Sequence, residues 1–189
     1  MKKLNILILL LSVVMLACER DDICAEGVST TPRLLIEFYD INNPDDLKSV
    51  PRISVYGEGR VVDENGTPTE PTTENSEGTL LFNENSTTVS LPLIVDLDNN
   101  DVITTRYILE KDTNLRLDED DTTQSDVDII EITYTTNFIY VSRACGYKSV
   151  FNNLDIDLEP VDGDTWINNI ELVTTEIENE NSAHVRILH

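Results

Sequence analysis

Alternation between apolar and polar positions is clearest in the stretch Arg33-Leu34-Leu35-Ile36-Glu37-Phe38-Tyr39-Asp40, which follows Pro32. Leu34, Ile36 and Phe38 recur at every second position, so they lie on one face of an extended chain. A helix would need an apolar repeat of about 3.6 residues, which this stretch lacks. The stretch therefore predicts a β-strand with one buried face.

Similar runs, rich in Ile, Val, Thr, Tyr and Phe, recur along the rest of the chain. They cover residues 53–56, 79–82, 89–95, 102–109, 127–135, 138–143, 166–177 and 183–188. Turn-forming sequences such as Glu64-Asn65-Gly66, Asp98-Asn99-Asn100 and Thr136-Asn137 separate them. Eight or nine short strands without helical periodicity predict an all-β fold, an antiparallel β-sandwich. The clearest hairpin is expected between residues 170–174 and 184–188.

Residues 32–189 have the size of a single domain with a sizeable core. Two segments within it lack strand patterning. Residues 57–78 are rich in Glu, Thr, Asn and Pro, and residues 112–126 are acidic and almost devoid of large apolar side chains. We expect both to be loose surface excursions.

The first 17 residues have the order of a bacterial secretory signal. Lys2-Lys3 precedes an apolar run of about 13 residues, and small Ala17 stands at the expected cut. The apolar run is too short to span a bilayer comfortably. Residues 1–17 are therefore predicted to be a signal peptide.

Cys18 changes the interpretation of this signal. In bacterial lipoprotein signals the thiol after the small residue accepts a diacylglyceryl group, and after cleavage it is the acylated first residue of the mature chain. We expect lipidation at Cys18, followed by a polar tether over residues 18–31. Ordinary secretion with a coincidental cysteine is the alternative.

The mature chain is strongly acidic. Removing residues 1–17 leaves 172 residues and takes away two of the 13 basic residues but none of the 36 acidic ones, so the formal charge is −25. Such a field repels nucleic acid and anionic lipid headgroups, so no nucleic-acid partner is expected. Membrane association is expected to come from the lipid anchor, for which several acyl chains suffice.

Two cysteines remain after Cys18 is assigned to the lipid. Cys24 and Cys145 form an even pair in an exported chain, which favours a disulfide. In the chain-entropy model a loop of this length contributes about 4 to 5 kcal/mol. Two unpaired thiols, one of them buried beside Ala144 and Gly146, are the alternative. Neither cysteine has the Cys-x-x-Cys spacing or neighbouring histidine of a redox or zinc site.

A calcium site is the first chemical possibility. Asp96, Asp98, Asn100 and Asp101 place oxygen ligands close together in one loop. The loop fails the EF-hand pattern, because its sixth position is Asp101 and its twelfth is Tyr107. A different calcium site could use it or the groups Asp118 to Asp121 and Asp155, Asp157, Asp162 and Asp164. Solvated acidic loops are the commoner meaning of such runs.

Catalytic patterns are scarce in this chain. His184 and His189 lie in or after the last expected strand, where we expect surface residues rather than ligands or bases. There is no nucleophile elbow and no glycine-rich phosphate loop, so no cofactor is expected. A hydrolase with a carboxylate pair stays an alternative, because an acidic chain offers many pairs. Trp166 and the tyrosines suit a core better than a sugar-stacking platform.

Several motifs together resemble a family of small lipoproteins from the Bacteroidetes, chiefly flavobacteria, catalogued as a domain of unknown function. They are Asp21-Asp22-Ile23-Cys24, Thr31 to Tyr39, Tyr140-Val141-Ser142-Arg143-Ala144-Cys145-Gly146-Tyr147, Trp166-Ile167 and Asn181 to Val185. The resemblance covers nearly the whole mature chain. It implies a compartment and a fold, and it carries no catalytic residue or reaction.

Two shorter resemblances follow from such a host. Glu19-Arg20-Asp21-Asp22 is similar to the acidic signals that send Bacteroidetes lipoproteins to the cell surface. Asp121-Thr122-Thr123 resembles their periplasmic O-glycosylation sequon, which makes Thr122 a candidate for modification; an unmodified loop is the alternative. We therefore expect a non-catalytic, lipid-anchored module at the outer membrane, with the cell surface favoured over the periplasmic face. Its partner would be a protein or a glycan, and a calcium-dependent binding domain is the alternative.

Overall fold

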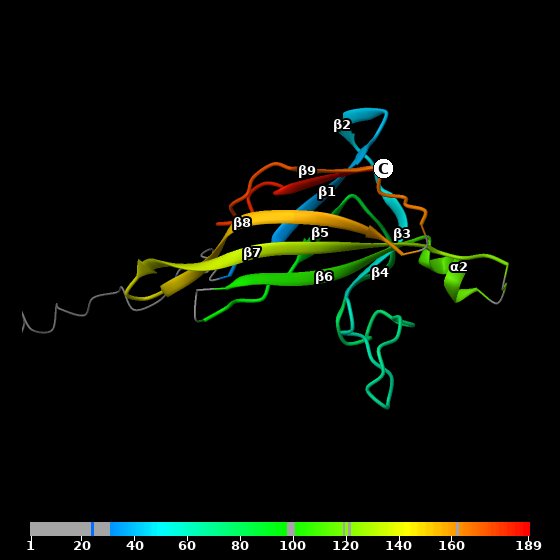
Figure 1. Ribbon diagram of the computed structural model, residues 1–189, viewed down its shortest axis with the longest axis horizontal. Helices are drawn as coiled ribbons and strands as arrows, with labels where there is room; N and C mark the ends of the chain where they lie inside the picture. Colours follow the sequence, from blue (N-terminus) through cyan, green and yellow to red (C-terminus); the bar gives the residue numbers. More distant parts are fainter. Residues whose placement is uncertain (1–23, 25–30, 98–100, 119, 121, 162) are drawn as a thin grey trace, which may run out of the picture.

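Two five-stranded sheets form the protein in its computed structural model, which describes residues 24, 31–97, 101–118, 120, 122–161 and 163–189 (Figure 1). The strands are β1 (Leu34–Asp40), β2 (Asn43–Leu47), β3 (Val50–Gly57), β4 (Thr79–Ser86), β5 (Thr88–Leu91), β6 (Val102–Lys111), β7 (Asp126–Ser142), β8 (Gly146–Pro160), β9 (Asn169–Leu172) and β10 (Val185–Leu188). One short helix, α2 (Thr113–Leu117), follows β6. The all-β sandwich predicted from the alternating runs is confirmed.

The first sheet has the order β2-β1-β10-β9. β1 pairs on one side with β10 and on the other with β5 along its first half and β2 at its end. The β1–β10 ladder is parallel, with Ile36 opposite Val185 and Phe38 opposite Ile187. The other ladders of the described strands are antiparallel. The expected antiparallel pairing thus has an exception at the centre of this sheet.

The second sheet has the order β4-β3-β6-β7-β8. Its longest element is the β7–β8 hairpin, of 17 and 15 residues, which projects past the other strands in Figure 1. The turn expected at Thr136-Asn137 is wrong: these residues lie within β7 and pair with Phe151 and Val150 of β8. Ladder bonds to β8, a strand that the patterning did not predict, satisfy this backbone and outweigh the turn propensity of Asn.

The core lies between the sheets. Leu34, Ile36 and Phe38 of β1 are fully buried, as their alternation predicts. From β7, Ile130, Ile132 and Tyr134 face them and are also fully buried. The remaining large core side chains include Ile53, Leu91, Leu109, Phe151, Ile167, Ile177, Val185 and Ile187.

Trp166 belongs to this core and not to a sugar-stacking platform. It is 6% exposed, and its ring lies 6.2 Å from that of Phe38 and 5.6 Å from that of His189, centroid to centroid. The strand expected over residues 166–177 is shorter, because β9 covers Asn169–Leu172. The predicted hairpin is nevertheless confirmed, since Leu172 pairs with Val185 and Asn169 with Leu188.

Both expected excursions carry local structure in their described residues. In the first, Val62 bridges Pro68, and the Asp63 carboxylate accepts hydrogen bonds from the backbone of Asn65 and Thr67. In the second, α2 packs its Thr113 into the protein, where the hydroxyl bonds to Ser54. No described helix is long and apolar enough to cross a membrane.

Candidate functional site

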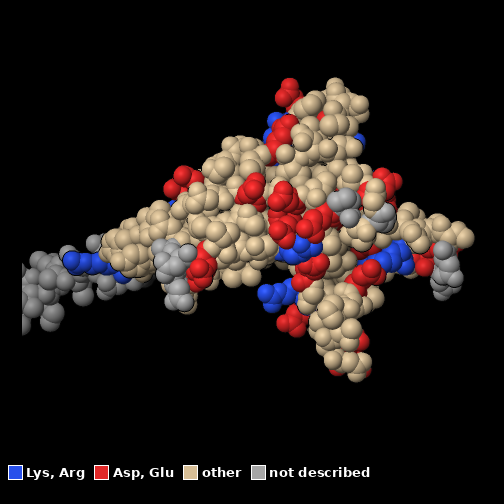
Figure 2. Space-filling model, viewed as in Figure 1, with Lys and Arg blue, Asp and Glu red and all other residues tan. Residues whose placement is uncertain are grey.

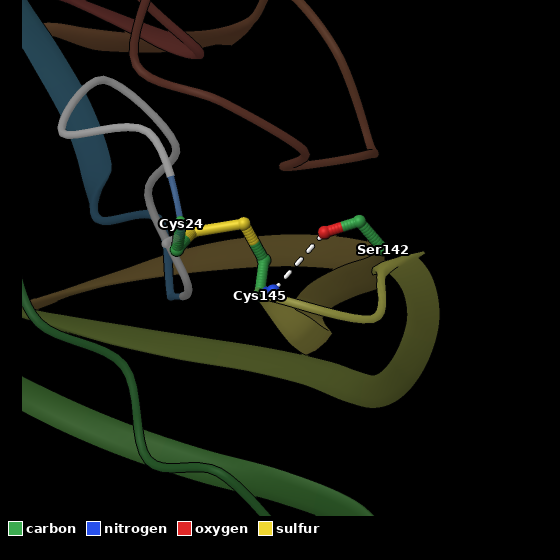
Figure 3. The surroundings of a disulfide bond; sticks show 3 residues. All are labelled: Cys24, Ser142 and Cys145. Carbon is green, nitrogen blue, oxygen red and sulfur yellow. Dashed lines mark hydrogen bonds between the residues drawn. A yellow bond between two sulfur atoms is a disulfide. The ribbon is translucent and has the colours of Figure 1, made fainter. Parts of the chain in front are cut away.

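The first feature of functional interest is the link between the N-terminal segment and the body. Cys24 and Cys145 are joined by a disulfide, with their Cα atoms 4.8 Å apart (Figure 3). Cys145 lies in the turn of the β7–β8 hairpin, where its N–H donates to the Ser142 hydroxyl at 3.0 Å. The disulfide expected from the cysteine count is confirmed. It holds the chain six residues after Cys18, which itself lies outside the described residues.

A cavity of about 440 Å³ opens on the edge of the sandwich near β3, β4 and β6. Apolar side chains such as Leu80 and Leu93 line it together with the charged groups of Glu58, Arg60 and Arg106. This volume suits a small ligand or one residue of a larger partner. The mixture of apolar walls and a few charged groups is typical of a binding site.

Arg60 is positioned by two glycines. A Cβ at Gly57 would lie 2.7 Å from Arg60 Cγ, and one at Gly78 would lie 2.8 Å from Arg60 Cβ. Gly78 also has a φ of +90°, which side-chain-bearing residues rarely adopt. The stem of Arg60 is thus pressed against backbone. Among the described residues, its exposed guanidinium has no ion-pair partner.

Arg106, on the same cavity, lies at the centre of an ionic cluster. Its Nε is 2.5 Å from Glu58, its Nη1 is 2.6 Å from Glu131 and its Nη2 is 2.6 Å from Glu159, measured to carboxylate oxygens. The hydrogen bond from Arg106 lowers the pKa of Glu159. In the view of Figure 2, acidic side chains gather around basic ones near the centre of the molecule. A carboxylate whose pKa is lowered, such as Glu159, is a poor proton donor.

Among the residues that the structure describes, two acidic side chains are fully buried, those of Glu110 and Asp128, and both hold loops. Glu110 accepts from Arg116 at 2.6 and 2.9 Å and from the Ser125 hydroxyl at 2.6 Å. Asp128 uses one oxygen to accept from the Thr165 hydroxyl at 2.7 Å and from two backbone N–H groups, of Trp166 at 3.1 Å and Ile167 at 3.0 Å. Neither carboxyl lines the cavity at Arg60.

Sequence reasoning did not single out these buried acids, although a signal exists. Asp128 occupies an inward position of the alternating series that continues with Ile130, Ile132 and Tyr134. A carboxylate at such a position needs partners, because burying it unpaired is costly. The position therefore marks a loop-holding residue. Arg106 gives no comparable signal, because its three carboxylates are distant in the sequence.

The acidic groups considered for calcium are placed in different regions. Asp96 and Asp101 flank residues 98–100, so Asp98 and Asn100 lie outside the described residues, as do Asp121 and Asp162. Asp155 and Asp157 are exposed along β8. In the part of the chain that the structure describes, no three His, Cys, Asp or Glu side chains are grouped as a metal site would require.

Thr122, the candidate for glycosylation, is exposed. Its hydroxyl donates to the Asp120 carboxylate at 2.6 Å, and its N–H donates to the same oxygen at 3.0 Å. The loop thus presents the hydroxyl at the surface in a defined local turn. Asp121, the first residue of the sequon-like triplet, lies outside the described residues.

The expectation that both histidines lie on the surface is wrong. His184 is 4% exposed and His189 is 8% exposed. His184 Nδ1 accepts from the Leu35 N–H at 2.9 Å, so Nε2 carries the proton and donates to the Asn179 carbonyl at 2.8 Å. Burial lowers the pKa of His184. The ring is a neutral crosslink between β1 and the segment that precedes β10.

Residues 71–189 match the model of a family described as "Family of unknown function (DUF6452)". The chain belongs to this family. The expected membership of a family of unknown function is therefore confirmed. Comparisons with curated proteins and with solved structures give no match.

The DUF6452 match covers β4 to β10, and with them Arg106, Asp128 and Cys145. β1 to β3 and Cys24 precede it. The matched part alone lacks β1, the central strand of the first sheet. The sandwich described above is completed by the preceding residues.

Proposed function

We propose that this protein is a lipid-anchored, non-catalytic β-sandwich that acts as an interaction module at the outer membrane. The observation that carries the proposal is the Cys24–Cys145 disulfide. It fixes on the body the segment that begins six residues earlier at Cys18, the proposed acylation site. A disulfide is also typical of an exported chain. The motifs resembling those of flavobacterial lipoproteins support the same location, with the cell surface as the favoured face.

The arrangement of charged groups supports binding rather than catalysis. Glu110 accepts hydrogen bonds from an arginine and a hydroxyl, and one oxygen of Asp128 accepts from a hydroxyl and two backbone N–H groups. The cavity beside Arg60 offers instead apolar walls and an exposed guanidinium. The Arg60 guanidinium is an exposed cation on a chain with a formal charge of −23 before processing. It would favour an acidic or hydroxyl-rich group of a protein or glycan partner.

The anchor is tested in cells given a fatty-acid analogue. The Cys18→Ser variant should lose the label and leave the membrane fraction, because no other thiol lies at the signal cleavage site. The matched control, Cys24→Ser with Cys145→Ser, removes the disulfide and should keep the label. Labelled Cys18→Ser protein would contradict the proposal. Added protease should digest the protein on intact cells, and complete resistance would place it on the periplasmic face.

Partner recognition is tested by crosslinking in outer membranes. Arg60→Ala removes the exposed guanidinium at the cavity, and Arg52→Ala removes another exposed arginine away from it. A partner that binds at the cavity should be lost from the crosslinked products of Arg60→Ala and kept in those of Arg52→Ala. A partner retained equally by both variants would exclude the cavity as its site.

A further inference from the structure

The end of the β7–β8 hairpin, residues 137–148, exposes apolar and aromatic side chains; it is called the hairpin tip below. Tyr140 is 55% exposed and Tyr147 is 65% exposed. Their rings meet edge to face across the ladder, with centroids 5.4 Å apart. Ile139 and Val141 are also exposed and, as neighbours of Tyr140 in the strand, point to the opposite face. Both faces of the tip therefore carry exposed apolar side chains.

The hairpin tip also differs in charge from the rest of the chain. The protein has 36 acidic residues among 189, but residues 132–154 contain none, whereas they include Arg143 and Lys148. Arg143 is exposed, and the Lys148 ammonium donates to the backbone carbonyl of Glu178 at 3.0 Å. A locally basic, aromatic end on an acidic protein is complementary to a surface of lipid phosphates.

The disulfide limits where this tip can be. Cys145 is in its turn, and Cys24 is six residues from Cys18. Six extended residues span at most about 20 Å. An acyl group on Cys18 would thus keep the tip within about 20 Å of the membrane surface. The opposite end of the molecule, near α2, lies far from the tip (Figure 1).

We propose that the hairpin tip inserts into the headgroup layer of the membrane that holds the anchor. The inference rests on the proposed lipidation of Cys18. Tyr140 is two residues from the turn that begins after Ser142, a distance of about 7 Å in a strand, within the depth of about 5 to 10 Å reached by interfacial segments. Tyrosine favours this layer because its ring is apolar and its hydroxyl is polar. Apolar side chains on both faces suit end-on insertion, whereas docking against a protein surface would cover one face.

The test uses the mature, lipidated protein, beginning at Cys18, in vesicles of phosphatidylethanolamine and phosphatidylglycerol. The acyl chains of these lipids carry bromine, a quencher of tryptophan fluorescence. Tyr147→Trp places the probe at the tip, and Val62→Trp places it on the first surface excursion, at a site that is 49% exposed. The native Trp166 is 6% exposed and supplies the background. Tyr140→Trp is a second tip variant if Tyr147→Trp does not fold.

The tip variant is expected to lose much of its added fluorescence in brominated vesicles relative to ordinary ones, and the Val62→Trp variant is expected to lose none. Vesicle flotation of each sample reports the anchor separately. Floating protein whose tip probe is not quenched would overturn tip insertion and leave the tip to a protein partner, with the anchor intact. Equal quenching of both probes would also overturn it. Protein that does not float would refute the lipid anchor and the inference with it.

Discussion

The strands β7 and β8 pair along nearly their whole length, with register shifts after Thr133 and after Tyr140, yet the two halves of this hairpin have different surroundings. In the half within the sandwich, Ile130, Ile132 and Tyr134 are fully buried. In the hairpin tip, Tyr140 continues the same alternation and is 55% exposed. Alternation therefore predicts which side chains share a face, but burial also needs a second layer opposite that face.

Different contacts hold the two halves. The inner half packs against the first sheet through the shared core, and Tyr134 meets Phe151 edge to face at 5.2 Å. The tip is joined to the rest of the chain by the Cys24–Cys145 disulfide and by the bond from Lys148 to the Glu178 carbonyl. Side-chain packing should thus stabilise the inner half, whereas the disulfide holds the tip and leaves its exposed side chains free for contacts outside the protein.

The largest effect is expected on removing the disulfide. Replacing Cys24 and Cys145 together by Ser should lower the free energy of unfolding by about 4 kcal/mol, because the crosslink restricts the unfolded chain over a separation of 121 residues. Urea unfolding of the purified protein in detergent measures the change, and reduction of the wild type should reproduce it. The inner half should still fold. Equal stability of the oxidised wild type and the double variant would contradict this expectation.

The next effect separates the two halves directly. Asp128→Ala should destabilise the fold by about 3 kcal/mol, because the Thr165 hydroxyl and the N–H groups of Trp166 and Ile167 lose their acceptor in the interior. Asp128→Asn keeps an acceptor oxygen and should cost less. Asp157→Ala, at an exposed position of β8, is the control and should change little. A small loss in Asp128→Ala would mean that the loop is held by packing alone.

The sequence was sufficient for what depends on local pattern. The period-two runs predicted β1 and β6, and the β9–β10 hairpin, because their inward side chains are apolar and their bounds are near turn residues. The cysteine count also favoured the disulfide, because assigning Cys18 to the expected lipid leaves one pair. The sequence did not predict β8, whose Asn152-Asn153 and alternating Asp155 and Asp157 have poor strand propensity.

The long-range pairings could not be predicted in this way. The parallel contact of β1 with β10 joins residues about 150 apart, and no local pattern specifies it. The Arg106 cluster likewise draws on Glu58, Glu131 and Glu159 from separate segments. In the candidate site, the cavity beside Arg60 depends on which strands become neighbours. Such features follow from topology, which residue spacing alone does not fix.

A smaller effect on stability is expected from His184, whose ring bonds to β1 in the sheet that covers the inner half. Burial lowers the pKa of His184 in the folded protein below its usual value near 6.5. Below that pH the unfolded state therefore binds more protons than the folded state, and the free energy of unfolding falls as the pH falls. Protonated Nδ1 would face the Leu35 N–H. His189 shifts in the same direction for the same reason. Urea unfolding at about pH 7.5 and 5.5 should show the loss, and His184→Gln should reduce it. An unchanged pH dependence in that variant would contradict a role for His184.

The smallest effect is expected at the hairpin tip. Replacing Tyr140 and Tyr147 together by Ala should lower the free energy of unfolding by less than about 1 kcal/mol, because both side chains are exposed and the main loss is one ring contact. Tyr134→Ala is the matched control in the inner half and should cost about 3 to 5 kcal/mol, because that ring is fully buried. Comparable losses from the tip and inner variants would show that the tip is packed in solution. Membrane insertion of the tip would then lose its basis, because it requires that Tyr140 and Tyr147 are exposed and do not stabilise the fold.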